Sequence, residues 1–149
     1  MLAAIGRILF AVLFVFSGGS KLWDIAATAQ TIGDKVVIPA VLTTYTSQLE
    51  TMTGMPFAQL MAIAAGATEV ICGLMIALNI GARFFAVILL LFVLAVTFFY
   101  HNFWDMTGAD RLNNMIHALK NLSIVGALLI IAGFPRIARR DTEVAYTDH

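Results

Sequence analysis

Residues 57–78, FAQLMAIAAGATEVICGLMIAL, form a run that is apolar and long enough to cross a bilayer as one helix, which takes about 20 residues. The only charged residue in this run is Glu69. Small residues recur at helical spacing on the same side of the run as Glu69: Ala62, Gly66, Gly73 and Ala77. Because small residues let a second helix approach closely, we expect Glu69 to face the interior of a helix bundle.

Three further runs of this kind, residues 4–23, 82–101 and 115–134, flank the first. The composition agrees with them, since the chain of 149 residues is 60% hydrophobic and only 12% charged, against about 25% charged residues in soluble domains. The runs are continuous and lack the alternation of barrel strands. The sequence therefore predicts an all-α integral membrane protein, a four-helix bundle that forms one membrane domain over residues 1–149.

Two segments lie outside the predicted spans. Residues 25–56 form an extramembrane insert, with Pro39 and a stretch rich in Thr and Ser at residues 43–53, and this insert is large enough to face a partner. Residues 136–149 are expected to be a mobile, solvated tail.

Basic residues predict the orientation of the four spans. Arg7, Arg83, Arg136, Arg139 and Arg140 would lie on one side of the membrane, and only Lys35 and Arg111 lie clearly on the other. Since Lys and Arg accumulate on the cytoplasmic side, we expect both termini to be cytoplasmic and the insert to be outside. The nine basic and nine acidic residues cancel, so the chain has no net charge that would attract nucleic acid.

Ionisable residues inside a membrane are costly and usually functional. One interpretation is a polar pocket in the outer half of the bundle, with contributions from all four spans: Lys21, Glu69, His101, His117 and Lys120. The alternative is that these groups only fix helix register by pairing, Glu69 with Lys120 or Lys21, and Asp24 with Lys21.

The residue pattern argues against several other kinds of site. Cys72 is the only cysteine and lies in an apolar run, so we expect a small packing residue and no disulfide within the chain. The ligand clusters that metals require are missing, and no pattern predicts a covalently held cofactor. His101 and His117 could face each other as axial haem ligands, but two histidines at membrane ends are weak evidence for haem.

Five motifs in order along nearly the whole chain make it resemble the DoxX family: GRILF with FSGGSKL (residues 6–10 and 16–22), GATEVICGL (66–74), GAR (81–83), HNFW (101–104) and KNLSIVG (120–126). The resemblance implies a four-span protein of the bacterial inner membrane. The positions that match the family are Arg7, Lys21, Glu69, Arg83, His101 and Lys120. The insert, at about residues 31–53, is longer than the usual family connection.

Some relatives in this family form the membrane part of a thiosulfate:quinone oxidoreductase, and others assemble with redox enzymes. The resemblance therefore implies that the polar pocket could bind a quinone, with Lys120, His117 or Lys21 as hydrogen-bond donors and Glu69 as a proton carrier. Glu69, Lys120 and His117 are then the catalytic candidates. Electrons would come from a bound substrate or a partner subunit.

Three functions follow, in order of preference. The first is a subunit of, or accessory to, a larger membrane redox or energy-conversion complex. The second is a quinone-interacting oxidoreductase component, and the third is a carrier for a small solute or for protons. Besides lipid and other membrane subunits, a second copy of the chain is an expected partner, because Gly73, Ala77 and Gly81 form a stripe of small residues.

Overall fold

The computed structural model describes residues 1–133, and within this range it contains helices and no strand. Four helices are long and apolar enough to cross a membrane: α1 (Leu2–Trp23), α4 (Phe57–Ala77), α5 (Ala82–Tyr100) and α6 (Gly108–Gly133). The predicted all-α fold with four apolar spans is confirmed. The predicted tail, residues 136–149, and the last residue of the predicted fourth span lie outside the described residues.

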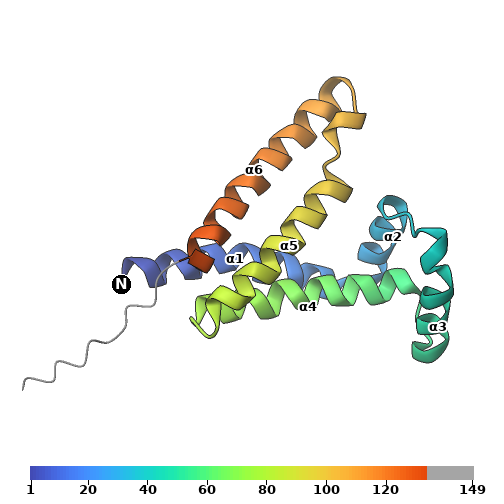
Figure 1. Ribbon diagram of the computed structural model, residues 1–149, viewed down its shortest axis with the longest axis horizontal. Helices are drawn as coiled ribbons and strands as arrows, with labels where there is room; N and C mark the ends of the chain where they lie inside the picture. The colour runs from blue at the N-terminus through green and yellow to red at the C-terminus, as the bar shows by residue number, and fades with distance from the viewer. Residues whose placement is uncertain (134–149) are drawn as a thin grey trace, which may run out of the picture.

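The four long helices form two antiparallel hairpins (Figure 1). Helix α1 packs along α4, and α5 packs along α6. The hairpins meet near the turn between α4 and α5, and the α5–α6 hairpin then leaves the α1–α4 pair at an angle. In this turn Asn79 and Gly81 both adopt left-handed backbone conformations, with φ of 60° and 57°, which reverse the chain within a few residues.

The stripe of small residues on α4 is what brings α1 close. A Cβ atom added to Gly18 of α1 would lie 2.5 Å from the carbonyl oxygen of Gly66, and one added to Gly66 would lie 2.8 Å from Cγ of Leu22. Gly73 is similarly covered, with Val15 Cγ2 at 3.2 Å. Part of the stripe that a second copy could have used is therefore occupied by α1 of the same chain.

The main apolar core lies where the two hairpins meet. Its buried residues include Phe14 of α1, Ile76 of α4, Leu89 of α5 and Leu128 of α6. Cys72 is buried in the same cluster, as expected for a packing residue. The four helices are thus joined mainly at this end of the molecule.

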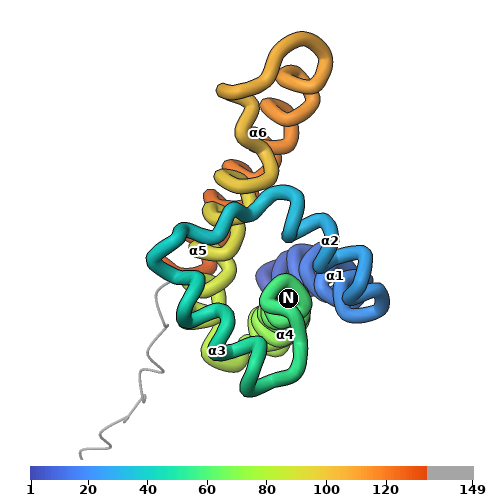
Figure 2. Tube along the Cα trace, turned by 90° about the vertical axis from the view of Figure 1, so that its right-hand side faces the viewer, coloured from blue at the N-terminus to red at the C-terminus, as the bar shows by residue number. Residues whose placement is uncertain are grey.

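The insert is helical as well. Helix α2 (Ile25–Lys35) packs on α4 through Ala29 and Ile32, which contact Ala62. The 3-10 helix η1 (Ala40–Leu42) leads into α3 (Thr43–Thr53), which ends at Gly54 with a φ of 68°. Helix α3 crosses the end of α4, which Figure 2 shows viewed along its axis.

Helix α6 begins earlier than the start of the predicted apolar span at Met115. A short 3-10 helix, η2 (Phe103–Asp105), follows α5, and α6 then starts at Gly108. Its first two turns are polar but still helical, and Asp110 in the first turn interacts favourably with the positive end of the helix dipole.

Candidate functional site

An ion pair joins α1 to α4 inside the apolar part of the molecule. Lys21 Nζ lies 2.8 Å from Glu69 Oε2, and it also donates a hydrogen bond of 2.6 Å to Ser17 Oγ. The Glu69 side chain is only 6% exposed, whereas that of Lys21 is 28% exposed. Of the pairings that the sequence left open, the structure shows the one between Glu69 and Lys21.

Local sequence explains this arrangement. Ser17 and Lys21 are four residues apart on α1 and therefore lie on the same side of the helix. Gly18 and Gly66 lie beside the pair and let the two helix backbones approach, which leaves little room for water around Glu69. Asp24 has a different role from the one considered above, because its Oδ1 accepts a hydrogen bond from the backbone N–H of Ala27 and caps α2.

The two histidines form a second cluster, at the end of the α5–α6 hairpin. The rings of His101 and His117 are stacked, with centroids 5.0 Å apart and planes 8° from parallel. His101 Nδ1 lies 3.1 Å from Asn114 Oδ1, and Asn114 Nδ2 donates to the carbonyl oxygen of Asp110. Nδ1 of His101 is therefore the donor in this contact, and the ring stack leaves no room for a haem between the two histidines.

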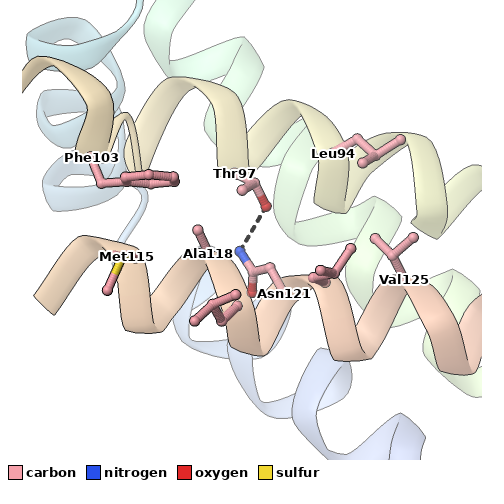
Figure 3. Close-up of a pocket in the computed structure, with 9 residues that line it drawn as sticks. Leu94, Thr97, Phe103, Met115, Ala118, Asn121 and Val125 are labelled. Carbon is pink, nitrogen blue, oxygen red and sulfur yellow. Dashed lines mark hydrogen bonds between the residues drawn. The ribbon is translucent and has the colours of Figure 1, made fainter. Parts of the chain in front are cut away.

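A third polar contact links α5 and α6 at greater depth. Asn121 Nδ2 donates a hydrogen bond of 2.9 Å to Thr97 Oγ1, which itself donates to the carbonyl oxygen of Val93. Beside this contact lies a cavity of about 250 Å³ whose other lining residues are apolar. Figure 3 shows the hydrogen bond between the two helices, with Leu94 and Val125 among the residues that line the cavity.

The five residues of the predicted pocket are thus divided between the two hairpins. Lys21 and Glu69 pair on α1 and α4, and His101 and His117 stack on α5 and α6. Lys120 is exposed on α6 and makes no ion pair with any residue in the range 1–133.

Helix periodicity shows which side of each helix these polar residues share with the apolar core. Lys21 and Ser17 lie on the side of α1 that carries Phe10 and Phe14. Lys120 and His117 lie on the side of α6 that carries Ile124. These apolar residues contribute to the shared core at the meeting end: Phe10, Phe14 and Ile124. The polar residues continue the same helix sides into the region where the hairpins diverge.

Sequence reasoning placed Asn121 on the same face as His117 and Lys120, but it missed Thr97 and Asn114. Thr97 and Asn121 are polar residues in otherwise apolar runs, which was a usable signal for a contact between their helices. Asn114 lies three residues before His117, but nothing in its spacing pointed to His101.

The fold is that of a small membrane protein with four spans, and a partly buried ion pair joins two of them. Comparison with known families identifies this class more closely. The DoxX family model matches residues 2–102, which include Lys21, Glu69 and His101. The chain belongs to the DoxX family.

A curated relative is the inner membrane protein YphA of Escherichia coli (strain K12), which is 32% identical over 132 residues. This match covers 89% of the chain and 81% of the relative. Together with the four apolar helices, it supports placement of the chain as a multi-pass protein of the inner membrane. No solved structure is significantly similar to the chain.

Proposed function

We propose that the protein is an accessory subunit of a larger membrane complex and that a partner helix covers the polar side of α6. This side consists of Asn113, His117, Lys120 and Asn121, and the first three are exposed. The observation that carries the proposal is this exposed polar strip, which continues into the apolar part of a spanning helix. Polar groups at such positions normally face protein or water, because lipid cannot form hydrogen bonds with them.

Depth distinguishes the residues of this strip. Lys120 lies only about 8 Å inside the apolar part of α6, so its amine can extend to the headgroups. Asn121 has no such reach, and its Oδ1 accepts no hydrogen bond from residues 1–133. A donor from a partner helix would satisfy this oxygen, and a carboxylate of the partner would give Lys120 a counterion.

The packing of α6 also supports a partner. Leu128 is the only buried residue of α6, whereas α4 has six buried residues. Because the hairpins diverge, most of α6 packs against α5 alone. The resemblance to DoxX proteins that assemble with redox enzymes favours a redox complex as the assembly.

Photo-crosslinking in native membranes tests this proposal. A photoreactive amino acid at Asn113, on the polar strip, is expected to crosslink one protein of defined mass. Lys120→Leu is expected to reduce the amount of this partner that is recovered with the chain after mild solubilisation. The matched control is Leu13, which is 50% exposed on α1, a helix that packs mainly on α4. If both positions crosslink only lipid, and the protein is recovered alone, the subunit proposal is wrong.

A quinone-interacting component is the second candidate, favoured by the cluster of Ser17, Lys21 and Glu69. Lys21 is 28% exposed, so its ammonium could donate a hydrogen bond to a quinone carbonyl. Glu69, ionised in this pair, would first take up a proton and then pass it to the quinone as two electrons arrive. Electrons would come from a partner or a bound substrate. In native membrane vesicles, which retain the electron donor, Glu69→Gln is expected to abolish quinone turnover without unfolding the protein, whereas Lys120→Met, outside this cluster, is expected to leave turnover unchanged. Full turnover in Glu69→Gln would remove this candidate.

A proton or small-solute carrier is the third candidate. Glu69 would serve as the relay, but its Oε2 is already engaged by Lys21, which opposes that role. Flux into protein-containing liposomes equal to that into empty vesicles would exclude a carrier.

A further inference from the structure

Helix α3 lies across the axis of the spanning helix that follows it. Figure 1 shows α3 crossing the end of α4, and Figure 2, turned by 90°, shows the same relation. Only Gly54, Met55 and Pro56 separate the two helices. When α4 spans the bilayer, α3 therefore lies along the membrane surface at the level where α4 enters it.

One side of α3 is apolar and uncovered. Helical spacing places on it three large apolar residues of α3 and Leu42, the residue that precedes α3, with exposures of 46%, 65%, 43% and 83%: Leu42, Tyr45, Leu49 and Met52. We call these four residues the α3 stripe. Ser47 lies on the opposite side, and Thr43 and Thr51 flank it.

Two contacts fix α3 relative to the start of α4. Glu50 Oε1 accepts a hydrogen bond of 2.7 Å from the backbone N–H of Phe57, and the left-handed conformation of Gly54 ends α3 there. Thr46 is the one residue of α3 that is partly buried, and it lies on the side that also carries Glu50. The α3 stripe lies next to this side, so α4 leaves it uncovered.

The surroundings of α3 match a membrane interface. Trp23, at the end of α1 that adjoins the insert, is 93% exposed, and Tyr45 belongs to the stripe itself. Trp and Tyr are enriched at this level because their rings have both an apolar body and a polar atom. The apolar surface of the spanning helices begins at Phe57, so the stripe adjoins a surface that lipid already covers.

We propose that α3 is an interfacial helix that inserts its stripe into the boundary between lipid headgroups and acyl chains. Such helices bury their apolar side about 5–10 Å into this boundary. Glu50 is the only charged residue of α3, and its carboxylate caps α4. Binding therefore depends on apolar burial and needs no anionic lipid. This inference is independent of the proposed subunit role, which concerns α6.

Site-directed fluorescence tests the proposal in the whole protein. In a Cys72→Ala background, Leu49→Cys and Met52→Cys place a label on the α3 stripe, and Ser47→Cys places one on the opposite side of the same helix. Each protein is inserted as a single copy into nanodiscs of phosphatidylcholine alone. Quenching by nitroxide-bearing lipids and by aqueous iodide is then measured.

We expect nitroxide lipids to quench the labels at Leu49 and Met52 several-fold more strongly than the label at Ser47, and iodide to show the reverse order. Addition of phosphatidylglycerol is expected to leave the ratio unchanged. Equal iodide quenching at all three positions would overturn the proposal. It would also be overturned if the stripe were shielded only in native membranes, or only with two copies in a disc, because the occupant would then be a protein.

Discussion

Lys21 Nζ and Glu69 Oε2 lie 2.8 Å apart and join two antiparallel helices at a point where Gly18 and Gly66 bring the backbones together. The two ends of this ion pair differ in their access to solvent, because the Glu69 side chain is 6% exposed and the Lys21 side chain is 28% exposed. The lysine can extend toward the surface if it loses its partner, but the carboxylate has no such route. Loss of Glu69 and loss of Lys21 should therefore reduce the free energy of unfolding by different amounts.

We expect Lys21→Met to destabilise the protein more than Glu69→Gln does. The first change leaves a buried carboxylate unpaired and should cost about 2–4 kcal/mol, somewhat less than a wholly buried pair would. The second change leaves an amine that can reach water and should cost about 1 kcal/mol. Unfolding in mixed micelles measures the free energy of unfolding of each variant. The double variant should lose less stability than the sum of the two single losses. Additive losses, or the reverse order, would contradict an energetically coupled pair.

The close approach of α1 to α4 provides a matched pair of glycine substitutions. A Cβ atom at Gly18 would lie 2.5 Å from the Gly66 carbonyl oxygen, whereas nothing lies within 4 Å of one at Gly19. Gly18→Ala is therefore expected to cost about 1–3 kcal/mol by overpacking. Gly19→Ala should change the free energy of unfolding by less than about 0.5 kcal/mol, since the site is open. Equal effects of the two changes would argue against this helix contact.

The spans, the stripe of small residues and the inward position of Glu69 could be predicted because each depends on composition and spacing within one helix. The choice of Lys21 over Lys120 as the partner of Glu69 could not be predicted. It depends on the angle between the hairpins, which no single helix specifies. The same angle separates the predicted pocket residues into two groups. The contact between Thr97 and Asn121 depends instead on how α5 packs along α6 within one hairpin.

The position of α3 across α4 could not be predicted from the sequence either. Its Thr-rich composition, residues 43–53, resembles a loop, because Thr has a modest helix propensity. Side-chain hydroxyls bond to carbonyl oxygens within the segment, as Thr46 does to Thr43 and Thr51 does to Ser47, so the polar side is satisfied within the helix.

The hydrogen bond between Asn121 and Thr97 should contribute to the packing of α5 against α6. Hydrogen bonds between membrane helices contribute about 0.6 kcal/mol on average and at most about 1.7 kcal/mol, so Thr97→Val and Asn121→Leu should each lose an amount in this range. Ser123→Ala is the control, because the Ser123 hydroxyl donates to the Leu119 carbonyl oxygen within α6. A double-mutant cycle that gives no coupling between Thr97 and Asn121 would show that the contact does not hold the helices together.

Orientation in the membrane can be tested independently of any activity. Arg7 lies near the start of α1 and Arg83 near the start of α5, and Figure 1 places these two helix starts at the same end of the molecule. Because Lys and Arg favour the cytoplasmic side, a C-terminal green fluorescent protein fusion should fluoresce, and a C-terminal alkaline phosphatase fusion should be inactive. Phosphatase inserted between α2 and α3 should be active. Replacing both Arg7 and Arg83 with Gln should produce a mixture of orientations, whereas an active phosphatase at the C-terminus of the unaltered chain would reverse the predicted topology.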